Sequence, residues 1–110
     1  MKVLAPEFQH KDSRRILTQL LTADVKQVNS YDAKRGSILG DHFHKKTLEY
    51  FYITKGTIVA SIGTSSLVFN KNSFFLVEPL EKHTIKCLTD VSMITLLTKV
   101  YSKEDTDTYV

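Results

Sequence analysis

Hydrophobic and polar residues alternate, or run in short apolar bursts, along most of this chain. Arg14–Leu21 is the one short stretch that is compatible with a helix, and nothing on either side extends its periodicity. Elsewhere, segments rich in β-branched and aromatic residues predict strands, at Val25–Asn29, Ile38–His44, Leu48–Thr54, Thr57–Ile62, Ser66–Phe69, Phe74–Val77, His83–Leu88 and Val91–Val100. Turn-forming residues separate them, including Tyr31-Asp32. Many short strands at roughly ten-residue intervals predict an all-β sandwich or barrel.

The chain length predicts a single domain. A chain of 110 residues matches one hydrophobic core, and we expect a domain over 1–101 followed by a flexible, polar C-terminal tail over 102–110. The longest apolar run, Phe74–Val77, is far too short to cross a bilayer. The first residues lack the apolar stretch of a secretory signal, so we expect a cytoplasmic protein.

Charge and cysteine content narrow the function classes. The formal net charge is +3, and the basic residues are scattered rather than clustered. We therefore expect neither a nucleic-acid nor a membrane partner, whereas a small anionic ligand suits the same surplus. The single cysteine, Cys87, excludes an intramolecular disulfide and a four-thiolate zinc site. We expect Cys87 to be a small buried side chain.

Three histidines and one glutamate have the spacing of a metal site. His42 and His44 lie two positions apart in a predicted strand, so both side chains point to the same face, roughly 6.6 Å apart along the strand. A turn after His44 would return Glu49 to that side, and His83 begins a later strand. Imidazole nitrogens and carboxylate oxygens are ligands for Zn, Fe, Mn, Ni or Cu.

The spacing around these residues resembles the first sequence motif of the cupin superfamily, G-x5-H-x-H-x3,4-E-x6-G. It runs from Gly36 through His42, His44 and Glu49 to Gly56. The second motif, G-x5-P-x-G-x2-H-x3-N, retains only His83, with Asn72 and Leu80 standing at its two glycine positions. Asn enters left-handed conformations readily, whereas Leu does not, so we expect the turn before His83 to differ from the family pattern.

The resemblance implies a single-domain cupin β-barrel of the jelly-roll type. It also implies a divalent transition metal (Zn, Fe, Ni or Mn) held by His42, His44, Glu49 and His83. Strand alternation then predicts which neighbours share the interior: Ile38 and Gly40 with the first two histidines, Phe51 and Ile53 with Glu49, and Ile85 and Cys87 with His83. Tyr50 and Tyr52 would face outward.

Shorter similarities point to cupins that act on sugars. The run Gly40–Lys45 resembles the G-x-H-A-H-K of sugar-nucleotide 3,4-ketoisomerases, and Asp12–Thr18 with Val25–Asn29 resembles the opening of deoxysugar-nucleotide 3,5-epimerases. The H-[YF]-H and the following Glu are similar to the C-terminal cupin of capsule-sugar enzymes. These similarities imply proton transfer next to the carbonyl of a nucleotide-linked sugar, in polysaccharide or deoxysugar synthesis, with His42 as the general base.

Two other functions fit the same residues. One is metal-dependent oxidation of a small molecule by a dioxygenase. The other is a non-catalytic cupin that binds a small ligand. A metal-bound His42 is also unavailable as a base, which leaves its two roles in competition. For the assembly we expect a homodimer, because small barrels carry exposed strand edges. The segment before Asp12 and Val91–Val100 are its expected contributors.

Overall fold

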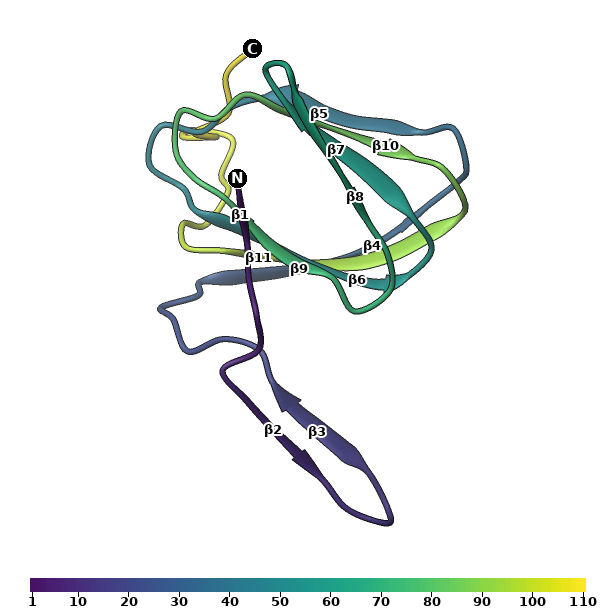
Figure 1. The fold of residues 1–110 in the computed structure, drawn as a ribbon. Coiled ribbons are helices and arrows are strands. Elements are labelled where there is room, and N and C mark those ends of the chain that lie inside the picture. Colours follow the sequence, from purple (N-terminus) through teal and green to yellow (C-terminus); the bar gives the residue numbers. More distant parts are fainter.

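The computed structural model describes residues 1–110 as strands and loops (Figure 1). It has no helix that is long and apolar enough to cross a membrane. The strands are β1 (Lys2–Val3), β2 (Phe8–Lys11), β3 (Ile16–Gln19), β4 (Gln27–Ala33), β5 (Ile38–His42), β6 (Glu49–Lys55), β7 (Ile58–Ile62), β8 (Ser65–Phe69), β9 (Phe74–Val77), β10 (His83–Cys87) and β11 (Val91–Leu97).

Two antiparallel sheets face each other and enclose the core (Figure 1). One has the strand order β1-β9-β6-β11-β4, and the other has the order β5-β10-β7-β8. The remaining two strands, β2 and β3, pair only with each other and form a hairpin that extends away from the barrel (Figure 1). The all-β class is therefore confirmed.

In the first third of the chain, the structure excludes a helix in the one stretch compatible with it and corrects one expected turn. The stretch Arg14–Leu21 is not helical, because Ile16–Gln19 forms β3 and is paired with β2. The turn expected at Tyr31-Asp32 lies inside β4, where Tyr31 pairs with Met93 and Asp32 with Ser92. Pairing along the whole of β11 extends β4 beyond the segment that composition predicts, so cross-strand partners outweigh local turn preference here.

The core follows the alternation expected for β6 and β10. Phe51 and Ile53 are buried from β6, and Ile85 and Cys87 are buried from β10. Phe75 stacks between two other rings, with centroid distances of 4.8 Å to Phe51 and 4.1 Å to Phe69. Tyr50 and Tyr52 lie on the opposite face of β6, where they pack with Phe74 in a second, smaller cluster.

Strand β5 does not keep the expected alternation. Ile38 is 66% exposed, whereas Leu39 packs against the core. Gly40 and Asp41 have positive φ angles of 88° and 62°, and the pairing of β5 with β10 shifts register between His83 and Thr84. This irregularity changes which side chains before it point into the barrel: Leu39 does so and Ile38 does not. The prediction that Ile38 points inward is therefore wrong.

Residues 102–110, which we expected to form a flexible tail, make specific contacts with the barrel. Tyr109 and Phe43 exchange two backbone hydrogen bonds of 2.9 Å, and their rings stack. Asp107 is buried. Composition alone does not reveal such docking, since its partners lie in the loop after β5.

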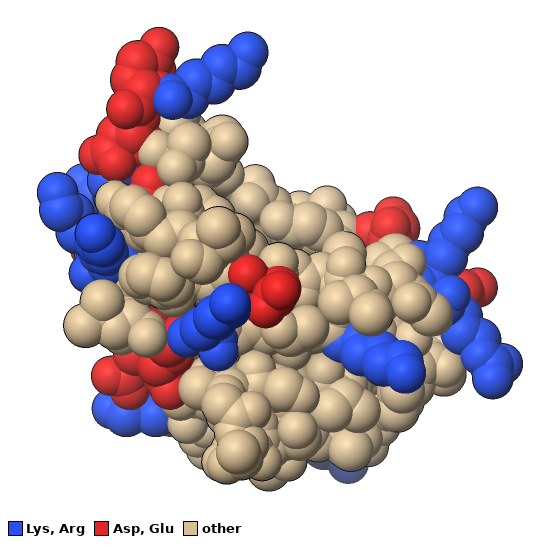
Figure 2. Space-filling view, turned by 90° about the horizontal axis from the view of Figure 1, so that it is seen from above, with Lys and Arg blue, Asp and Glu red and all other residues tan.

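Charged side chains of both signs are interspersed on the face shown in Figure 2. Over the surface of the molecule, several charged side chains form ion pairs, including Lys82 with Asp41 at 3.7 Å and Lys2 with Glu78 at 3.3 Å. This face therefore presents no continuous basic field.

The two residues at the glycine positions of the second motif, Asn72 and Leu80, both have left-handed backbone conformations. Asn72 and Leu80 have φ angles of 72° and 71°, in the left-handed region. The Leu80 N–H donates a 2.6 Å hydrogen bond to the carbonyl of His44. The hydrogen bond and the flanking strands hold Leu80 in a conformation that its Cβ disfavours.

Replacement of Leu80 by Gly should therefore stabilise the protein. We expect Leu80→Gly to raise the free energy of unfolding by about 1 kcal/mol, because glycine accepts a positive φ without steric cost and Leu80 is 70% exposed, so little burial is lost. The control is Leu67→Gly in β8, outside the left-handed region, which should lower stability. Urea denaturation measures both, and a loss of stability in Leu80→Gly would contradict the assignment of strain.

Candidate functional site

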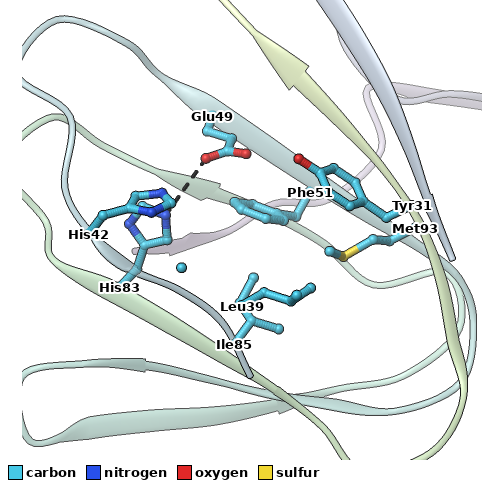
Figure 3. Close-up of a pocket in the computed structure, with 9 residues that line it drawn as sticks. Tyr31, Leu39, His42, Glu49, Phe51, His83, Ile85 and Met93 are labelled. Atoms are coloured by element: carbon cyan, nitrogen blue, oxygen red, sulfur yellow. Dashed lines mark ion pairs between the residues drawn. The ribbon is translucent and has the colours of Figure 1, made fainter. Parts of the chain in front are cut away.

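Four side chains meet at one end of the space between the two sheets, and Figure 3 shows three of them, His42, Glu49 and His83. His42 ends β5, His44 lies in the loop that follows, Glu49 begins β6 and His83 begins β10. One nitrogen or carboxylate oxygen from each lies within 4.8 Å of the others. The structure thus brings together all four residues that the sequence singles out.

Backbone carbonyls orient two of the three imidazoles. The Nδ1 of His44 lies 2.8 Å from the carbonyl oxygen of Asp107, and the Nδ1 of His83 lies 3.0 Å from that of Glu81. A carbonyl oxygen only accepts hydrogen bonds, so both Nδ1 atoms carry the proton. Each Nε2 then points to the same Glu49 oxygen, at 3.1 Å from His44 and 3.7 Å from His83.

This arrangement fits a cation. When both imidazoles are neutral, two Nε2 lone pairs face an ionised carboxylate oxygen inside a site from which water is largely excluded. Such a buried set of electron pairs is unfavourable unless a proton or a metal ion lies among them. Hydrogen bonds from the distal ring nitrogens to carbonyls are also the usual support of metal-binding histidines. The group therefore could hold a metal through His44, Glu49 and His83, with His42 within reach.

His42 differs from the other two histidines. Its ring makes no hydrogen bond to the protein and is only partly buried, and its centroid lies 4.6 Å from that of His83 and 4.9 Å from that of His44. Burial, together with the nearby His83 and His44, lowers the pKa of His42 below its usual value. A neutral ring at neutral pH can accept a proton or donate a lone pair to a cation.

The pKa values of the other members reflect the same contacts. Burial acts to raise the pKa of Glu49, but its interactions with His44 and His83 lower it to about 2. Burial acts to lower the pKa of His44, yet hydrogen bonds to Glu49 and to the Asp107 carbonyl raise it overall. Glu49 is therefore ionised throughout the physiological range.

Two pockets of different character adjoin the cluster. The inner pocket extends into the barrel and is mainly apolar, with walls that include Leu39, Phe51, Ile85 and Met93 (Figure 3). The outer pocket opens beside the C-terminal segment, and most of its lining residues carry polar groups, including Gln27, Asn29, Tyr101 and Thr108. Their volumes are about 320 and 730 Å³. His42 and Glu49 line both, so the cluster lies where the two meet.

Tyr31 is a site residue that the sequence analysis missed. It lines both pockets from β4, and its hydroxyl lies on the same side as Glu49 in Figure 3. The two tyrosines considered from sequence, Tyr50 and Tyr52, lie on the far face of β6 and do not reach the cluster. The turn assignment at Tyr31-Asp32 concealed this residue. In the longer strand β4, Tyr31 pairs with the buried Met93, and strand alternation would have predicted an inward side chain at this position.

Cys87 lies in the hydrophobic core and lines neither pocket. Burial raises the pKa of its thiol, so it is a weak nucleophile and a poor ligand.

No protein-family model and no curated protein sequence matches this chain. Solved structures do. The capsular polysaccharide assembling protein CapF of Staphylococcus aureus is 22% identical with a TM-score of 0.69, over 93% of this chain and 33% of CapF. The rmlC epimerase of Mycobacterium tuberculosis is 19% identical with a TM-score of 0.74, over 94% of this chain and 70% of that one.

A third similar structure is a variant of the 3,4-ketoisomerase QdtA from Thermoanaerobacterium thermosaccharolyticum in complex with TDP-4-keto-6-deoxyglucose. It is 16% identical with a TM-score of 0.74, over 94% of this chain and 83% of that one. All three are cupin-fold proteins.

This chain has the cupin fold. The two facing sheets are thus the two halves of a cupin barrel, and the cluster occupies the position that the first cupin motif and His83 predict. The chain spans about a third of the length of CapF. At these identities the likeness establishes the fold and leaves the chemistry to the site itself.

Gly40, which lies beside His83, should be more sensitive to substitution than Gly36, which precedes β5. Gly36 and Gly40 have φ angles of 87° and 88°, so alanine at either costs about 1 kcal/mol in the backbone. A Cβ at Gly36 meets nothing within 4 Å, whereas one at Gly40 would lie 2.9 Å from the His83 carbonyl oxygen. We expect Gly40→Ala to lose about 1–3 kcal/mol more stability in urea denaturation than Gly36→Ala. Equal losses would contradict the close approach of β5 to β10.

Proposed function

We propose that this protein is a metal-dependent cupin that transfers a proton next to the carbonyl of a nucleotide-linked sugar, in cytoplasmic deoxysugar or polysaccharide synthesis. The observation that supports it most directly is the pair of carbonyl-anchored histidines whose Nε2 atoms converge on Glu49. His44, Glu49 and His83 hold a divalent transition metal in this proposal. Once bound, the metal polarises a ligand oxygen.

His42 is assigned to the proton transfer. It is the histidine without an anchoring hydrogen bond, it lines both pockets, and its lowered pKa keeps it neutral at pH 7. A neutral imidazole with a pKa near or below neutrality is an effective general base. Tyr31 lies on the pocket wall formed by β4, across from His42, and its hydroxyl can return or relay a proton from there.

The ligand class rests on the outer pocket and on the similar structures. Amide and hydroxyl groups of Gln27, Asn29, Tyr101 and Thr108 can bind sugar hydroxyls. The inner pocket is too small and too apolar for a nucleotide, so the nucleotide must remain outside. QdtA structures contain TDP or TDP-4-keto-6-deoxyglucose, and another similar structure is a dTDP-4-dehydrorhamnose 3,5-epimerase of Sulfolobus tokodaii.

Metal binding and proton exchange test the two parts of this proposal separately. We expect purified protein to bind one Zn²⁺, Fe²⁺, Ni²⁺ or Mn²⁺ per chain, measured by metal analysis and titration calorimetry. His44→Ala, Glu49→Gln and His83→Ala should each weaken binding at least 10-fold, because each removes one donor. His10→Ala, at an exposed histidine in β2, is the control. Absence of stoichiometric metal would exclude the metal assignment.

Proton transfer is measured by deuterium wash-in from D₂O into TDP-4-keto-6-deoxyglucose. We expect His42→Ala to retain metal and lose exchange by about 10²–10⁴-fold. Loss of metal in His42→Ala would instead make His42 a fourth ligand. Oxygen consumption with small thiols, diketones or aromatics, and no exchange, would favour a dioxygenase. A metal-loaded protein with neither activity would be a ligand-binding cupin.

We also propose that the protein is a homodimer in which the β2–β3 hairpin contacts a second copy of the chain. Phe8 and Leu17 lie on the same face of the hairpin and are 53% and 47% exposed. A two-stranded hairpin without further cover is marginally stable in water. The other expected contributor, Val91–Val100, has no free edge: β11 lies between β4 and β6.

The dimer is tested by light scattering after size exclusion. We expect a mass of two chains for the wild type, and dissociation by the double variant Phe8→Gln/Leu17→Gln, because the apolar contact area is lost. The control Val68→Gln alters a residue on β8 that is 61% exposed and should leave the dimer intact. A monomeric wild type would contradict the proposal.

A further inference from the structure

The C-terminal segment 99–110, called here the strap, lies against the barrel beside the cluster of His42, His44, Glu49 and His83. Lys99 pairs with Asp105 at 3.2 Å, and the Tyr101 N–H donates to the side-chain oxygen of Gln27 at 2.9 Å. Near its end, Tyr109 pairs with Phe43, and the Lys45 ammonium lies 4.2 Å from the centre of the Tyr109 ring. These contacts place the strap against the loop that carries His44.

Asp107 is the most strongly bound residue of the strap. Its carboxylate accepts hydrogen bonds from the backbone N–H groups of Lys45, Lys46 and Thr47, at 3.1, 2.9 and 2.8 Å, and from the Thr47 hydroxyl at 2.7 Å. Burial acts to raise the pKa of Asp107, but these donors lower it to about 2. The ionised side chain therefore acts as a clamp on the turn between His44 and Glu49.

The backbone of the same residue orients His44. The Asp107 carbonyl accepts the Nδ1–H of His44 at 2.8 Å. The corresponding partner of His83, the carbonyl of Glu81, lies two residues away in its own turn and needs no other part of the chain. The partner of His44 is 63 residues away and is in place only when the strap is docked.

We infer that Asp107 is a positioning residue of the metal site: its side chain docks the strap, and its carbonyl fixes the proton of His44 on Nδ1. Nε2 is then the atom that faces Glu49 and the cation. The strap also supplies Tyr101 and Thr108 to the outer pocket. Docking of the strap therefore completes both the metal site and the lining of the outer pocket. The part concerning metal affinity rests on the proposed function, whereas the part concerning His44 does not.

The experiment reads His44 in metal-free protein. Nitrogen-15 chemical shifts of labelled histidines at pH 9 report which ring nitrogen carries the proton. We expect wild type to have both His44 and His83 protonated on Nδ1. In Asp107→Ala, His44 should lose this preference while His83 keeps it. Thr47→Val, which removes one of the four donors, should give a smaller shift in the same direction, and Glu104→Gln, an equal charge change at an exposed residue of the strap, should give none.

A His44 that keeps its Nδ1 proton in Asp107→Ala and Thr47→Val would overturn the inference. A change shared equally by His83 would also overturn it, because that would indicate a general loss of structure. If circular dichroism shows Asp107→Ala to be unfolded, Thr47→Val decides by the same criterion.

A second measurement connects His44 to the metal. Titration with Zn²⁺ should show at least 10-fold weaker binding by Asp107→Ala and less than 2-fold by Glu104→Gln, as expected for loss of a group that orients a ligand. Unchanged Zn²⁺ affinity in a folded Asp107→Ala would overturn the metal part. A wild type that binds no Zn²⁺, Fe²⁺, Ni²⁺ or Mn²⁺ would refute the proposed function, whereas the shift of the His44 proton would still support the positioning role.

Discussion

The organisation of this barrel depends on how an ionised carboxylate is accommodated in its interior. Glu49 is 7% exposed and lies beside His44 and His83, which are 5% and 2% exposed. Burial of these groups is unfavourable unless each polar atom has a partner. Two carbonyls bind the distal nitrogens of His44 and His83, so the near nitrogens and the carboxylate remain directed at one point. A proton or a cation at that point satisfies all of them.

The two sheets bring the cluster together from opposite sides. Glu49 comes from β6 in the five-stranded sheet, whereas His42 and His83 are cross-strand partners on β5 and β10 of the other. The close approach of those two strands requires a glycine at position 40, where a side chain would meet the His83 carbonyl. His44 follows the end of β5 in a loop, and for that reason its ring needs support from elsewhere in the chain. The strap provides it.

The position of the cluster between an apolar and a polar pocket limits its chemistry. His42, His44 and Glu49 of the cluster line the outer pocket, with Tyr31 on the adjoining wall. On the other side, the apolar side chains of the inner pocket lower the polarity beside the cluster, which strengthens electrostatic interactions there. Related folds host epimerases, ketoisomerases and a capsular polysaccharide protein, so the residues of the two pockets distinguish this protein more than its fold does.

Residue type and spacing were sufficient to predict an all-β sandwich or barrel and the inward residues on β6 and β10, and the resemblance to the cupin motifs implied the barrel and the four members of the cluster. These features are local: alternation places Glu49, Phe51 and Ile53 on one face, and a fixed-spacing motif needs only neighbouring residues. Tyr31, the inversion at Ile38 and the docking of Asp107 could not be predicted in this way. Each depends on a partner distant in the chain: Met93 for Tyr31, His83 for the bend at Gly40, and the Lys45–Thr47 turn for Asp107. Local sequence patterns do not predict such pairings, because the free energy that stabilises each pairing arises only when the strands and the strap pack against one another.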